Sequence, residues 1–391
     1  TVRIFVKLHV GATESWLFEN TKRMKLRIAL IGTGVIAGHH VRLNAEPDAI
    51  IFPDGEAEFV AVMDVDEERA GDFAKKFRIP RVYTDADELL EKEKPHIVCV
   101  TTPPQSHAEL SIKAMEASAW VLCEKPLCGS LRELDAIRAA ETRTGMHCSS
   151  VYQFRFGGAP QHIKRMIDEE GAGKPLVGTC HTTWYRDPDY YEVDWRGTWA
   201  SELGGPTMIH GIHAMDAFLW AMGDWVEVRA LCSTLDRDIE VEDISSASVL
   251  FSNGAIGSIL NSILCPHERT FLRYDFQQGT AWTEAALYDL NRDKWRFKTL
   301  DTMDPEKAET FKTITDDTVT KQPSQLKAMV ADYQAGRPPL VSGPEARRTI
   351  EFITALYKSA ATGRPVKPGT IVEGDPFYEH VGGTFAQTSS E

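Results

Sequence analysis

The sequence predicts that the chain opens with an α/β domain built on a doubly wound parallel sheet, and three observations carry this prediction. An apolar run at residues 28–31 is typical of a buried strand and ends in a glycine-rich turn. Up to about residue 150, further short apolar runs alternate with segments of helical pattern. The chain has 391 residues, of which 42% are hydrophobic, so it can bury two cores.

The stretch GTGVIA, residues 32–37, lies between the first strand and a segment able to begin a helix. In this GxGxxA pattern the first glycine permits a tight reversal, the second lets the backbone approach a pyrophosphate, and the alanine lets helix and strand pack closely. A plain strand–turn–helix is the alternative, but the strands that follow favour a dinucleotide site in a Rossmann domain. The expected contacts in this turn are Gly32, Thr33, Gly34, Val35, Ile36 and Ala37.

Asp64 ends the next apolar run, FVAVMD, and indicates which dinucleotide is bound. An aspartate at this point accepts both ribose hydroxyls of NAD and repels the additional phosphate of NADP. The separation from Gly32 exceeds the usual ~20 residues, and the segment EPDAIIFPDGEAE has the look of an insertion that accounts for it. We therefore predict NAD rather than NADP.

The βα alternation continues with the strands HIVCVTT, WVLCEKP and HCSSVYQF. Helices are expected between them, one from a capping box at Ser106 and Glu109 to about Ser118, the other over residues 131–144. Ligands of such sheets bind outside the carboxyl ends of the strands. A helix cap is the alternative role for the histidine of TTPPQSH, and a surface position is the alternative for the lysine of EKP, although the following proline argues against it. The expected cofactor contacts at these ends are Thr102, Pro103, His107, Glu124 and Lys125.

Charge and composition limit the partners and the compartment. The formal net charge is −14 and no run of lysine or arginine occurs, which argues against nucleic acids and anionic membranes and favours a small molecule. No apolar stretch reaches the ~18 residues of a spanning helix. Seven cysteines without a CxxC pair fit a reducing environment, so we expect a cytoplasmic protein. Residues 1–23, ahead of Met24, are either a strand-like arm or not native.

Five motifs occur in one order along the chain: GTGVIAG, VAVMDVDEERA, TTPPQSH, CEKP and GGPTMIHGIHAMD. In this order they resemble the Gfo/Idh/MocA family of sugar oxidoreductases, which includes glucose-fructose oxidoreductase and inositol dehydrogenase. The resemblance runs from about residue 26 to about residue 370. CEKP and the segment GG…GIH…D are its more specific parts.

The resemblance implies a second, α+β domain with a large open, mostly antiparallel sheet, whose exposed face forms a homodimer or homotetramer. ASVLFSNGAIGSIL supports this independently, because it predicts a hairpin that turns at Asn253 and Gly254. A closing helix is expected near Pro344, with Ser342 and Glu345 in capping-box spacing. The expected organisation is an N-terminal extension at 1–23, the NAD-binding Rossmann domain at 24–150, the substrate and oligomerisation domain at 151–375 and a tail at 376–391.

Oxidation of a secondary alcohol needs a base that takes the hydroxyl proton while hydride leaves the same carbon. The resemblance implies a relay made of the EKP lysine, an aspartate, and a histidine four residues after it. Lys125 and His213 match, but Ile209 stands in the aspartate's place and His210 follows it. Either Lys125 and His213 suffice or His210 takes part of the role, and a structural histidine is the alternative for both.

The same segment contains His210, His213 and Asp216 at helical spacing, which is a pattern able to hold a metal ion. No third soft ligand is evident in the sequence, and the family does not generally need a metal. We therefore expect no metal site.

The segment WYRDPDYYEVDWRGTW, residues 184–199, indicates the substrate class. Flat aromatic faces next to forked hydrogen-bond donors suit a pyranose, which has apolar C–H faces and a rim of hydroxyls. An aromatic cluster at a domain interface is the alternative. The expected substrate contacts are Arg155, Tyr185, Trp195, Arg196 and His213.

Three function classes follow from these residues. We favour an NAD-dependent dehydrogenase or reductase acting on a sugar, polyol or glycoside. The second is the family's NAD-dependent glycosidase or lyase branch, in which the cofactor is oxidised and reduced within one turnover. The third, a non-catalytic sugar or dinucleotide sensor, is disfavoured because Lys125 and His213 are present.

Overall fold

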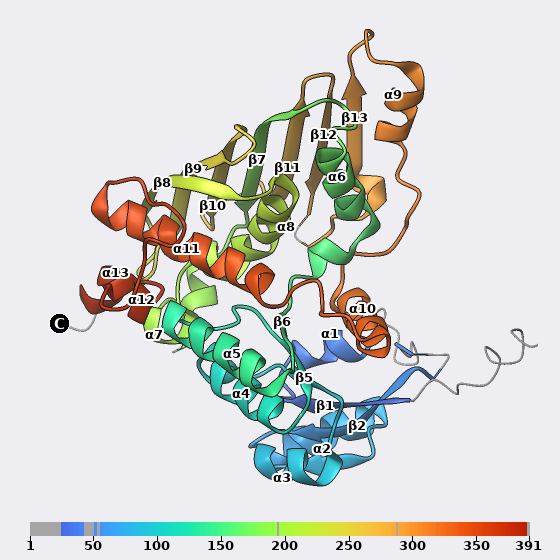
Figure 1. Cartoon of the computed structure of the whole chain (residues 1–391). Coiled ribbons are helices and arrows are strands. Elements are labelled where there is room, and N and C mark those ends of the chain that lie inside the picture. Colours follow the sequence, from blue (N-terminus) through green and yellow to red (C-terminus); the bar gives the residue numbers. More distant parts are fainter. Residues whose placement is uncertain (1–24, 43–50, 53–54, 194, 287, 389–391) are drawn as a thin grey trace, which may run out of the picture.

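The computed structural model describes residues 25–42, 51–52, 55–193, 195–286 and 288–388. The expected extension at 1–23 and part of the expected insertion ahead of Asp64 lie outside the described residues. Figure 1 shows two sheets, one in each of two domains, with several helices between them. This is the predicted pairing of a parallel α/β domain with a second domain built on a larger sheet.

The first domain contains a six-stranded parallel sheet in the order β3-β2-β1-β4-β5-β6. The order reverses between β1 and β4, as in a doubly wound dinucleotide-binding fold, so the predicted class is confirmed. Its strands are β1 (Leu26–Ile31), β2 (Ala57–Met63), β3 (Arg81–Tyr83), β4 (Ile97–Val100), β5 (Trp120–Cys123) and β6 (Cys148–Ser150). Its helices are α1 (Ala37–Val41), α2 (Glu67–Phe77), α3 (Ala86–Glu93), α4 (His107–Glu116) and α5 (Leu131–Thr144).

The second domain contains a seven-stranded sheet in the order β13-β12-β11-β7-β10-β9-β8. Only the β7–β10 pair is parallel, and the hairpin between β9 and β10 turns where the sequence predicts it. The strands are β7 (Pro175–Thr183), β8 (Trp225–Ser233), β9 (Ile244–Phe251), β10 (Ile256–Ser262), β11 (Arg269–Phe276), β12 (Gly279–Ala285) and β13 (Trp295–Thr299). The helices of this half are α6 (Gly158–Asp168), α7 (Trp199–Glu202), α8 (Ile212–Met222), α9 (Pro305–Lys312), α10 (Gln322–Ala335) and α11 (Pro344–Thr362).

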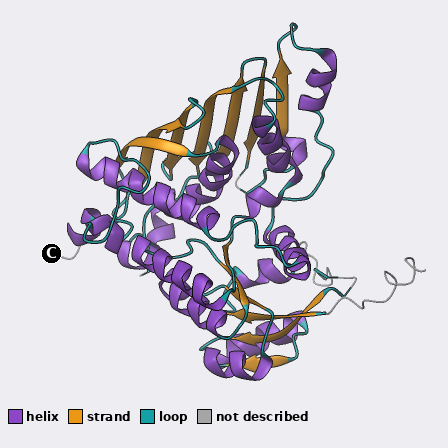
Figure 2. Cartoon of the chain, in the orientation of Figure 1, coloured by secondary structure: helices purple, strands orange, loops and turns teal. Residues whose placement is uncertain are grey.

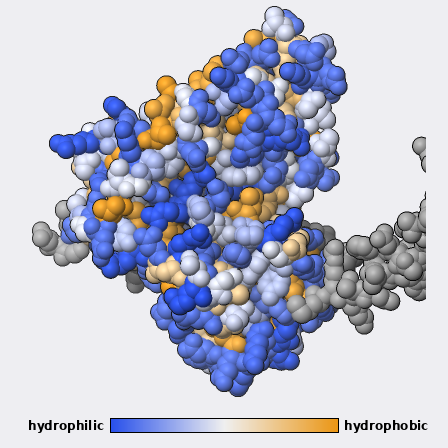
Figure 3. Space-filling view, viewed as in Figure 1, coloured by the Kyte–Doolittle hydropathy of each residue, from blue (hydrophilic) through white to orange (hydrophobic). Residues whose placement is uncertain are grey.

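Among the residues that the structure describes, helices cover only one face of this sheet. Figure 2 shows α6, α8 and α11 together on that side, and the side chains that alternate away from them are exposed. Val177, Ile256 and Leu250 lie next to one another across β7, β10 and β9, with exposed fractions of 46%, 59% and 41%. Figure 3 shows hydrophobic residues along the side of the C-terminal domain where β8, β9 and β10 lie. The open, partly apolar face is the feature that the family resemblance implied.

One helix from the second half of the sequence completes the first domain. α10 packs beside α1, and its Leu326, Met329 and Val330 join the core formed by β1 and neighbouring strands. Although α10 follows the second sheet in the sequence, its apolar residues therefore cover the N-terminal sheet.

Two predicted capping boxes do not form. The hydroxyl of Ser106 donates to the hydroxyl of Thr102 and to the Pro103 carbonyl, and no side chain among the described residues caps α4. Ser342 donates to the Pro339 carbonyl, and Gly343 is the residue that precedes α11. In both places the serine finds an acceptor in its own loop.

The expected tail at 376–391 is structured as far as residue 388. It contains α12 (Pro376–Glu379) and α13 (Thr384–Thr388), and it buries Phe377 and Val381. Phe385 stacks on Trp199 with 5.9 Å between the ring centroids. These apolar contacts hold the segment against the domain.

Candidate active site

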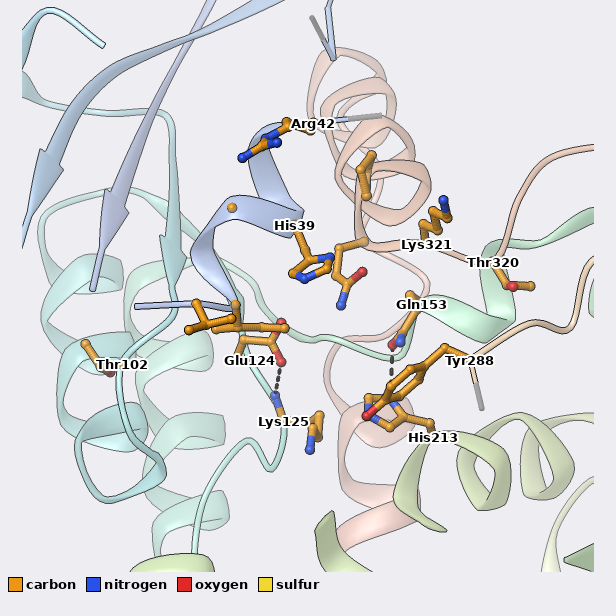
Figure 4. Close-up of a pocket in the computed structure, with 15 residues that line it drawn as sticks. His39, Arg42, Thr102, Glu124, Lys125, Gln153, His213, Tyr288, Thr320 and Lys321 are labelled. Atoms are coloured by element: carbon orange, nitrogen blue, oxygen red, sulfur yellow. Dashed lines mark hydrogen bonds between the residues drawn. The ribbon is translucent and has the colours of Figure 1, made fainter. Parts of the chain in front are cut away.

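The carboxyl ends of β1, β4 and β5 meet at a cavity of about 690 Å³ between the two domains. Figure 4 shows Thr102, Glu124 and Lys125 from the first domain opposite His213 and Tyr288 from the second. The structure therefore brings together residues that lie far apart in the sequence. The lining comprises Val35, Ile36, Gly38, His39, Arg42, Thr102, Glu124, Lys125, Gln153, His213, Tyr288, Thr320, Lys321, Gln322 and Pro323.

The glycine-rich turn has the form that a pyrophosphate needs. Gly32 has φ +92°, and a Cβ there would lie 2.8 Å from the backbone of Thr101 and Thr102. A Cβ on Gly34 would meet no atom within 4 Å, so its backbone borders open space. Ala37 begins α1 and is buried. The turn thus fits a dinucleotide phosphate at the start of a helix.

Asp64 follows β2 directly beside this turn. Its carboxylate accepts hydrogen bonds from the backbone N–H and the hydroxyl of Thr33, at 2.8 and 2.9 Å, and from Arg69. Burial alone would raise the pKa of Asp64, but the bonds from Arg69 and Thr33 hold it well below its usual range. The position expected to bind ribose therefore carries a fixed negative charge.

Glu124 and His40 form a buried pair beneath the cavity. His40 Nε2 donates to Glu124 Oε1 at 2.8 Å, and Glu124 Oε2 accepts from the Lys125 backbone N–H at 3.1 Å. Burial would raise the pKa of Glu124, but the His40 hydrogen bond and the charge of Lys125 lower it. This pair links α1 to the strand end that carries the lysine.

Lys125 donates from Nζ to the backbone carbonyl of Ile209 at 2.8 Å. Ile209 lies in a π-helical turn, Thr207–Gly211, just before α8. Loss of hydration lowers the pKa of the Lys125 ammonium, against the opposing charges of Glu124 and Glu202. At the position where the family resemblance implied an aspartate, the chain offers a neutral carbonyl dipole to this lysine.

His213 lies in the first turn of α8 and is 3% exposed. Its Nδ1 donates to Gln153 Oε1 at 3.1 Å, which leaves Nε2 as the acceptor nitrogen, and the ring of Tyr288 packs edge-on against it (Figure 4). Burial, together with the charge of Lys125, lowers the pKa of His213 well below 6.5, so the imidazole is neutral.

Gln153 and Tyr288 were not among the sequence candidates. Gln153 follows β6 at the ligand-binding edge of the sheet, so its position carried a signal that could have identified it. Tyr288 lies between β12 and β13, and nothing in the local sequence distinguishes it from other tyrosines.

His210 is 4% exposed and is not part of the cavity lining. Its ring packs against Trp184 and Tyr190, with centroids at 5.2 and 6.3 Å. Burial and the charges of Arg186, Lys125 and Arg196 lower its pKa well below 6.5. Within the described residues, Nδ1 has no hydrogen-bond partner.

His107 is buried beside the cavity and does not line it. Its two ring nitrogens lie 2.7 and 2.8 Å from the carbonyl oxygens of Pro126 and Thr102. It therefore ties the TTPPQSH loop, which includes Pro103, to the turn that carries Lys125.

The four expected substrate residues outside α8 have different surroundings. The Arg155 guanidinium is fully buried, donates to both Asp216 oxygens at 2.7 Å and contacts Glu345. Because its guanidinium is already paired with these carboxylates, Arg155 is not part of the substrate site proposed below. Asp216, part of the pattern considered for a metal ion, is held in the same network.

The loop that carries Tyr185, Trp195 and Arg196 is partly exposed, with Tyr185 at 38% and Trp195 at 52%. The Arg196 guanidinium lies 3.8 Å from the Tyr190 ring centroid and 4.3 Å from that of Trp195. The loop thus presents rings and a guanidinium side by side, and these three residues do not belong to the lining of the cavity.

Comparison with known proteins agrees with this geometry. The family described as "Oxidoreductase family, NAD-binding Rossmann fold" matches residues 26–152, and the GFO/IDH/MocA C-terminal domain matches residues 160–281. The chain is 27% identical to the myo-inositol 2-dehydrogenase of Thermotoga maritima, over 89% of this chain and 100% of the relative. It is 26% identical to the D-apiose dehydrogenase of Paraburkholderia graminis, over 91% and 93% of the two chains.

A solved structure shows the same architecture. The WlbA dehydrogenase from Chromobacterium violaceum, in complex with NADH and UDP-GlcNAcA, superposes with a TM-score of 0.75 at 27% identity. The match covers 90% of this chain and 98% of that one. No helix among the described residues is long and apolar enough to cross a membrane. The chain therefore belongs to the Gfo/Idh/MocA family and is an NAD-dependent oxidoreductase that acts on CH–OH groups.

Proposed function

We propose that this enzyme interconverts a secondary alcohol of a sugar, polyol or glycoside and the corresponding ketone, with Lys125 and His213 as the proton relay. One observation carries the proposal: both side chains line the cavity that begins at the glycine-rich turn. When bound, NAD supplies the acceptor for the hydride that leaves the alcohol carbon. The protein must therefore take up the hydroxyl proton.

Lys125 suits the role of first proton acceptor. Its lowered pKa increases the share of neutral amine near neutral pH, and only that form accepts a proton. One N–H can keep the hydrogen bond to the Ile209 carbonyl while the lone pair takes the proton. The carbonyl thus orients Nζ. Unlike a carboxylate, it does not hold the lysine in its positively charged form.

His213 suits the role of second acceptor or of hydrogen-bond partner to the substrate. Gln153 sets its tautomer, so Nε2 is free to accept. His210 is the alternative to His213, and its burial among aromatic rings outside the cavity lining favours a supporting role. No metal enters this relay.

The substrate class rests on the loop at 184–199. Tyr185, Trp195 and Arg196 provide ring faces and a guanidinium that suit the apolar faces and hydroxyl rim of a carbohydrate. The names of the relatives, which include inositol and apiose dehydrogenases and a protein in complex with UDP-GlcNAcA, point to the same class.

The proposal extends to assembly and compartment. The open face of the C-terminal sheet exposes Val177, Leu250 and Ile256 together, so we propose a homodimer or homotetramer formed through it. Light scattering that gave a mass near 43.7 kDa at micromolar concentration would contradict this. All seven cysteines are free, which supports a cytoplasmic enzyme.

A screen of sugars, polyols and glycosides with NAD, followed by NADH absorbance, tests the activity. Accumulation of NADH with a carbohydrate supports the dehydrogenase. Product release without net NADH would instead indicate the glycosidase or lyase branch. Tight carbohydrate binding without any turnover would indicate a sensor.

A further inference from the structure

Glu202 is a buried carboxylate that belongs neither to the cofactor motif nor to the lysine and histidine of the relay. It ends α7 and is 4% exposed. Its Oε2 accepts from the Gly197 backbone N–H at 2.7 Å, and its Oε1 accepts from Arg196 Nη1 at 3.2 Å. Burial raises the pKa of Glu202, whereas the Gly197 hydrogen bond and the charges of Arg196 and Lys125 favour its ionised form. Glu202 and the relay lysine therefore act on each other electrostatically.

Hydrogen bonds between the two domains hold α7 beside the relay. Gln105 Nε2, from the TTPPQSH loop of the first domain, donates to the Ser201 carbonyl of α7 at 2.8 Å. His107, at the end of the same loop, lies with Nδ1 2.7 Å from the Pro126 carbonyl oxygen. One loop thus contacts both the helix that carries the carboxylate and the turn that carries the lysine.

The aromatic loop connects the same two groups from the other side. The Arg196 guanidinium lies 3.8 Å from the Tyr190 ring centroid, and Nη1 donates to the Tyr190 hydroxyl. The Tyr190 ring centroid lies 6.3 Å from that of His210, and the carbonyl just before His210 accepts from Lys125. The aromatic loop and the relay lysine therefore have one carboxylate as a common neighbour.

Lys125 needs a counter-charge when it takes up a proton, because a positive charge then forms where hydration is reduced. Ile209 stands where the family resemblance implied an aspartate. Glu124 already accepts from His40 and from the Lys125 backbone N–H, whereas Glu202 belongs to a different domain. In the described part of the chain, the charged and titratable groups that face Lys125 from the surrounding elements are Glu124, Glu202, Arg196, His107, His210 and His213.

We propose that Glu202 is a positioning residue of the proton relay: its carboxylate is the counter-charge that stabilises Lys125 once the lysine is protonated. In the oxidation step the hydroxyl proton goes to Lys125 Nζ and the hydride goes to NAD, while Glu202 forms and breaks no bond. Arg196 shares the carboxylate, so the ammonium is supported less strongly than in a direct ion pair and can release its proton again. The part in the relay rests on the proposed function, whereas the coupling of the two side chains does not.

The pH dependence of kcat/KM for alcohol oxidation tests the role in the relay. Glu202→Gln removes the charge at nearly constant shape, so the midpoint of the profile should move down by about one pH unit. The plateau should fall by about threefold, because a weaker base accepts the proton more slowly. Arg196→Gln should move the midpoint upward, because it removes a cation that opposes protonated Lys125. A Glu202→Gln midpoint that stays or rises would overturn this role.

Glu141→Gln is the matched control. Glu141 is also buried, accepts from one backbone N–H and one arginine, and is not part of the cavity lining. The midpoint of its profile should equal that of the natural enzyme. An equal shift in Glu141→Gln and Glu202→Gln would overturn the inference, because the effect would then come from the loss of any buried carboxylate.

A measurement on the free protein separates the inference from the proposed function. Acetylation of Lys125 by acetic anhydride, followed by mass spectrometry across pH, reports the charge of the lysine without substrate. Its midpoint should also move down by about one pH unit in Glu202→Gln and return towards the natural value in Glu202→Asp, which restores the carboxylate. An unchanged acetylation midpoint in Glu202→Gln would overturn the inference. A shifted acetylation midpoint beside an unchanged rate profile would support the coupling and contradict Lys125 as the proton acceptor.

Thermal melting and calorimetric titration with NAD show whether each variant is folded. If Glu202→Gln does not fold, the acetylation midpoint of Arg196→Gln decides, because Glu202 then acts on Lys125 without sharing its charge. That midpoint should rise above the natural value. A midpoint that stays or falls in Arg196→Gln would overturn the inference.

Discussion

Asp64 and Lys125 are both ionisable groups at the carboxyl edge of the same sheet, but the protein treats their charges in opposite ways. Asp64 has five hydrogen bonds to its carboxylate and a pKa held well below its usual range. Within the described part of the chain, Lys125 has one hydrogen bond from Nζ, to a neutral carbonyl, and its pKa is lowered. The first group keeps its charge at any working pH, and the second can lose it. An ionised carboxylate can accept hydrogen bonds from both ribose hydroxyls, whereas a group that moves a proton must change its charge.

The largest expected effect comes from removing the exchangeable charge. Lys125→Met should lower turnover by about 10² or more, the range for a lost general acid/base. Its NAD affinity should stay nearly intact, because the turn and Asp64 are untouched. Steady-state kinetics together with calorimetric titration would show the split. Near-full activity of Lys125→Met would remove the contrast between the two groups and the assigned relay with it.

His210 and His213 test the same contrast between a group with a fixed state and a group that exchanges a proton. His213→Ala should lower turnover by about 10², because its Nε2 is free at the cavity. His210→Ala should lower turnover less than about fivefold if its packing against Trp184 and Tyr190 is a supporting role. Comparable losses in the two variants would instead place His210 in the relay, as the replacement for the aspartate.

Gln153 tests whether a neutral partner controls the relay. Gln153→Leu removes the acceptor for His213 Nδ1–H and frees both tautomers, so turnover should fall by about tenfold. Gln153→Glu is the informative comparison, since a carboxylate there should raise the pKa of His213 and shift the acid limb of the pH–rate profile upward. Unchanged pH profiles in both variants would contradict the role of Gln153.

The smallest expected effect is the pH dependence of the natural enzyme. Because the Lys125 pKa is lowered, kcat/KM for alcohol oxidation should rise with pH and level off below the usual lysine pKa of about 10.4. The rate falls as pH decreases, because the protonated amine cannot accept the hydroxyl proton. Over the same range, NAD binding should stay flat, since Asp64 remains ionised. If kcat/KM stayed constant with pH while NAD affinity changed, the comparison between Asp64 and Lys125 would be wrong.

Much of the fold and of the cofactor site was predictable because it depends on local pattern. Apolar runs, the glycine-rich turn and the Asn253–Gly254 hairpin each lie within a few residues, and each is present in the structure. Asp64 and Lys125 could be placed because the ends of parallel strands share one edge. The two predicted capping boxes do not form, because each serine hydroxyl donates to an acceptor in its own loop. The spacing of residues along the sequence does not reveal such an acceptor.

By itself, the sequence determined the doubly wound domain, its nucleotide turn, and the positions of Lys125 and His213 along the chain. Tertiary structure alone decided their partners. The Ile209 carbonyl reaches Lys125 across 84 residues, and Gln153 reaches His213 across 60. Arg155 likewise forms a buried ion pair with Asp216, a residue that is distant in the sequence. Hydrogen-bond partners depend on how two domains pack, and packing depends on contacts between distant segments that no local periodicity contains.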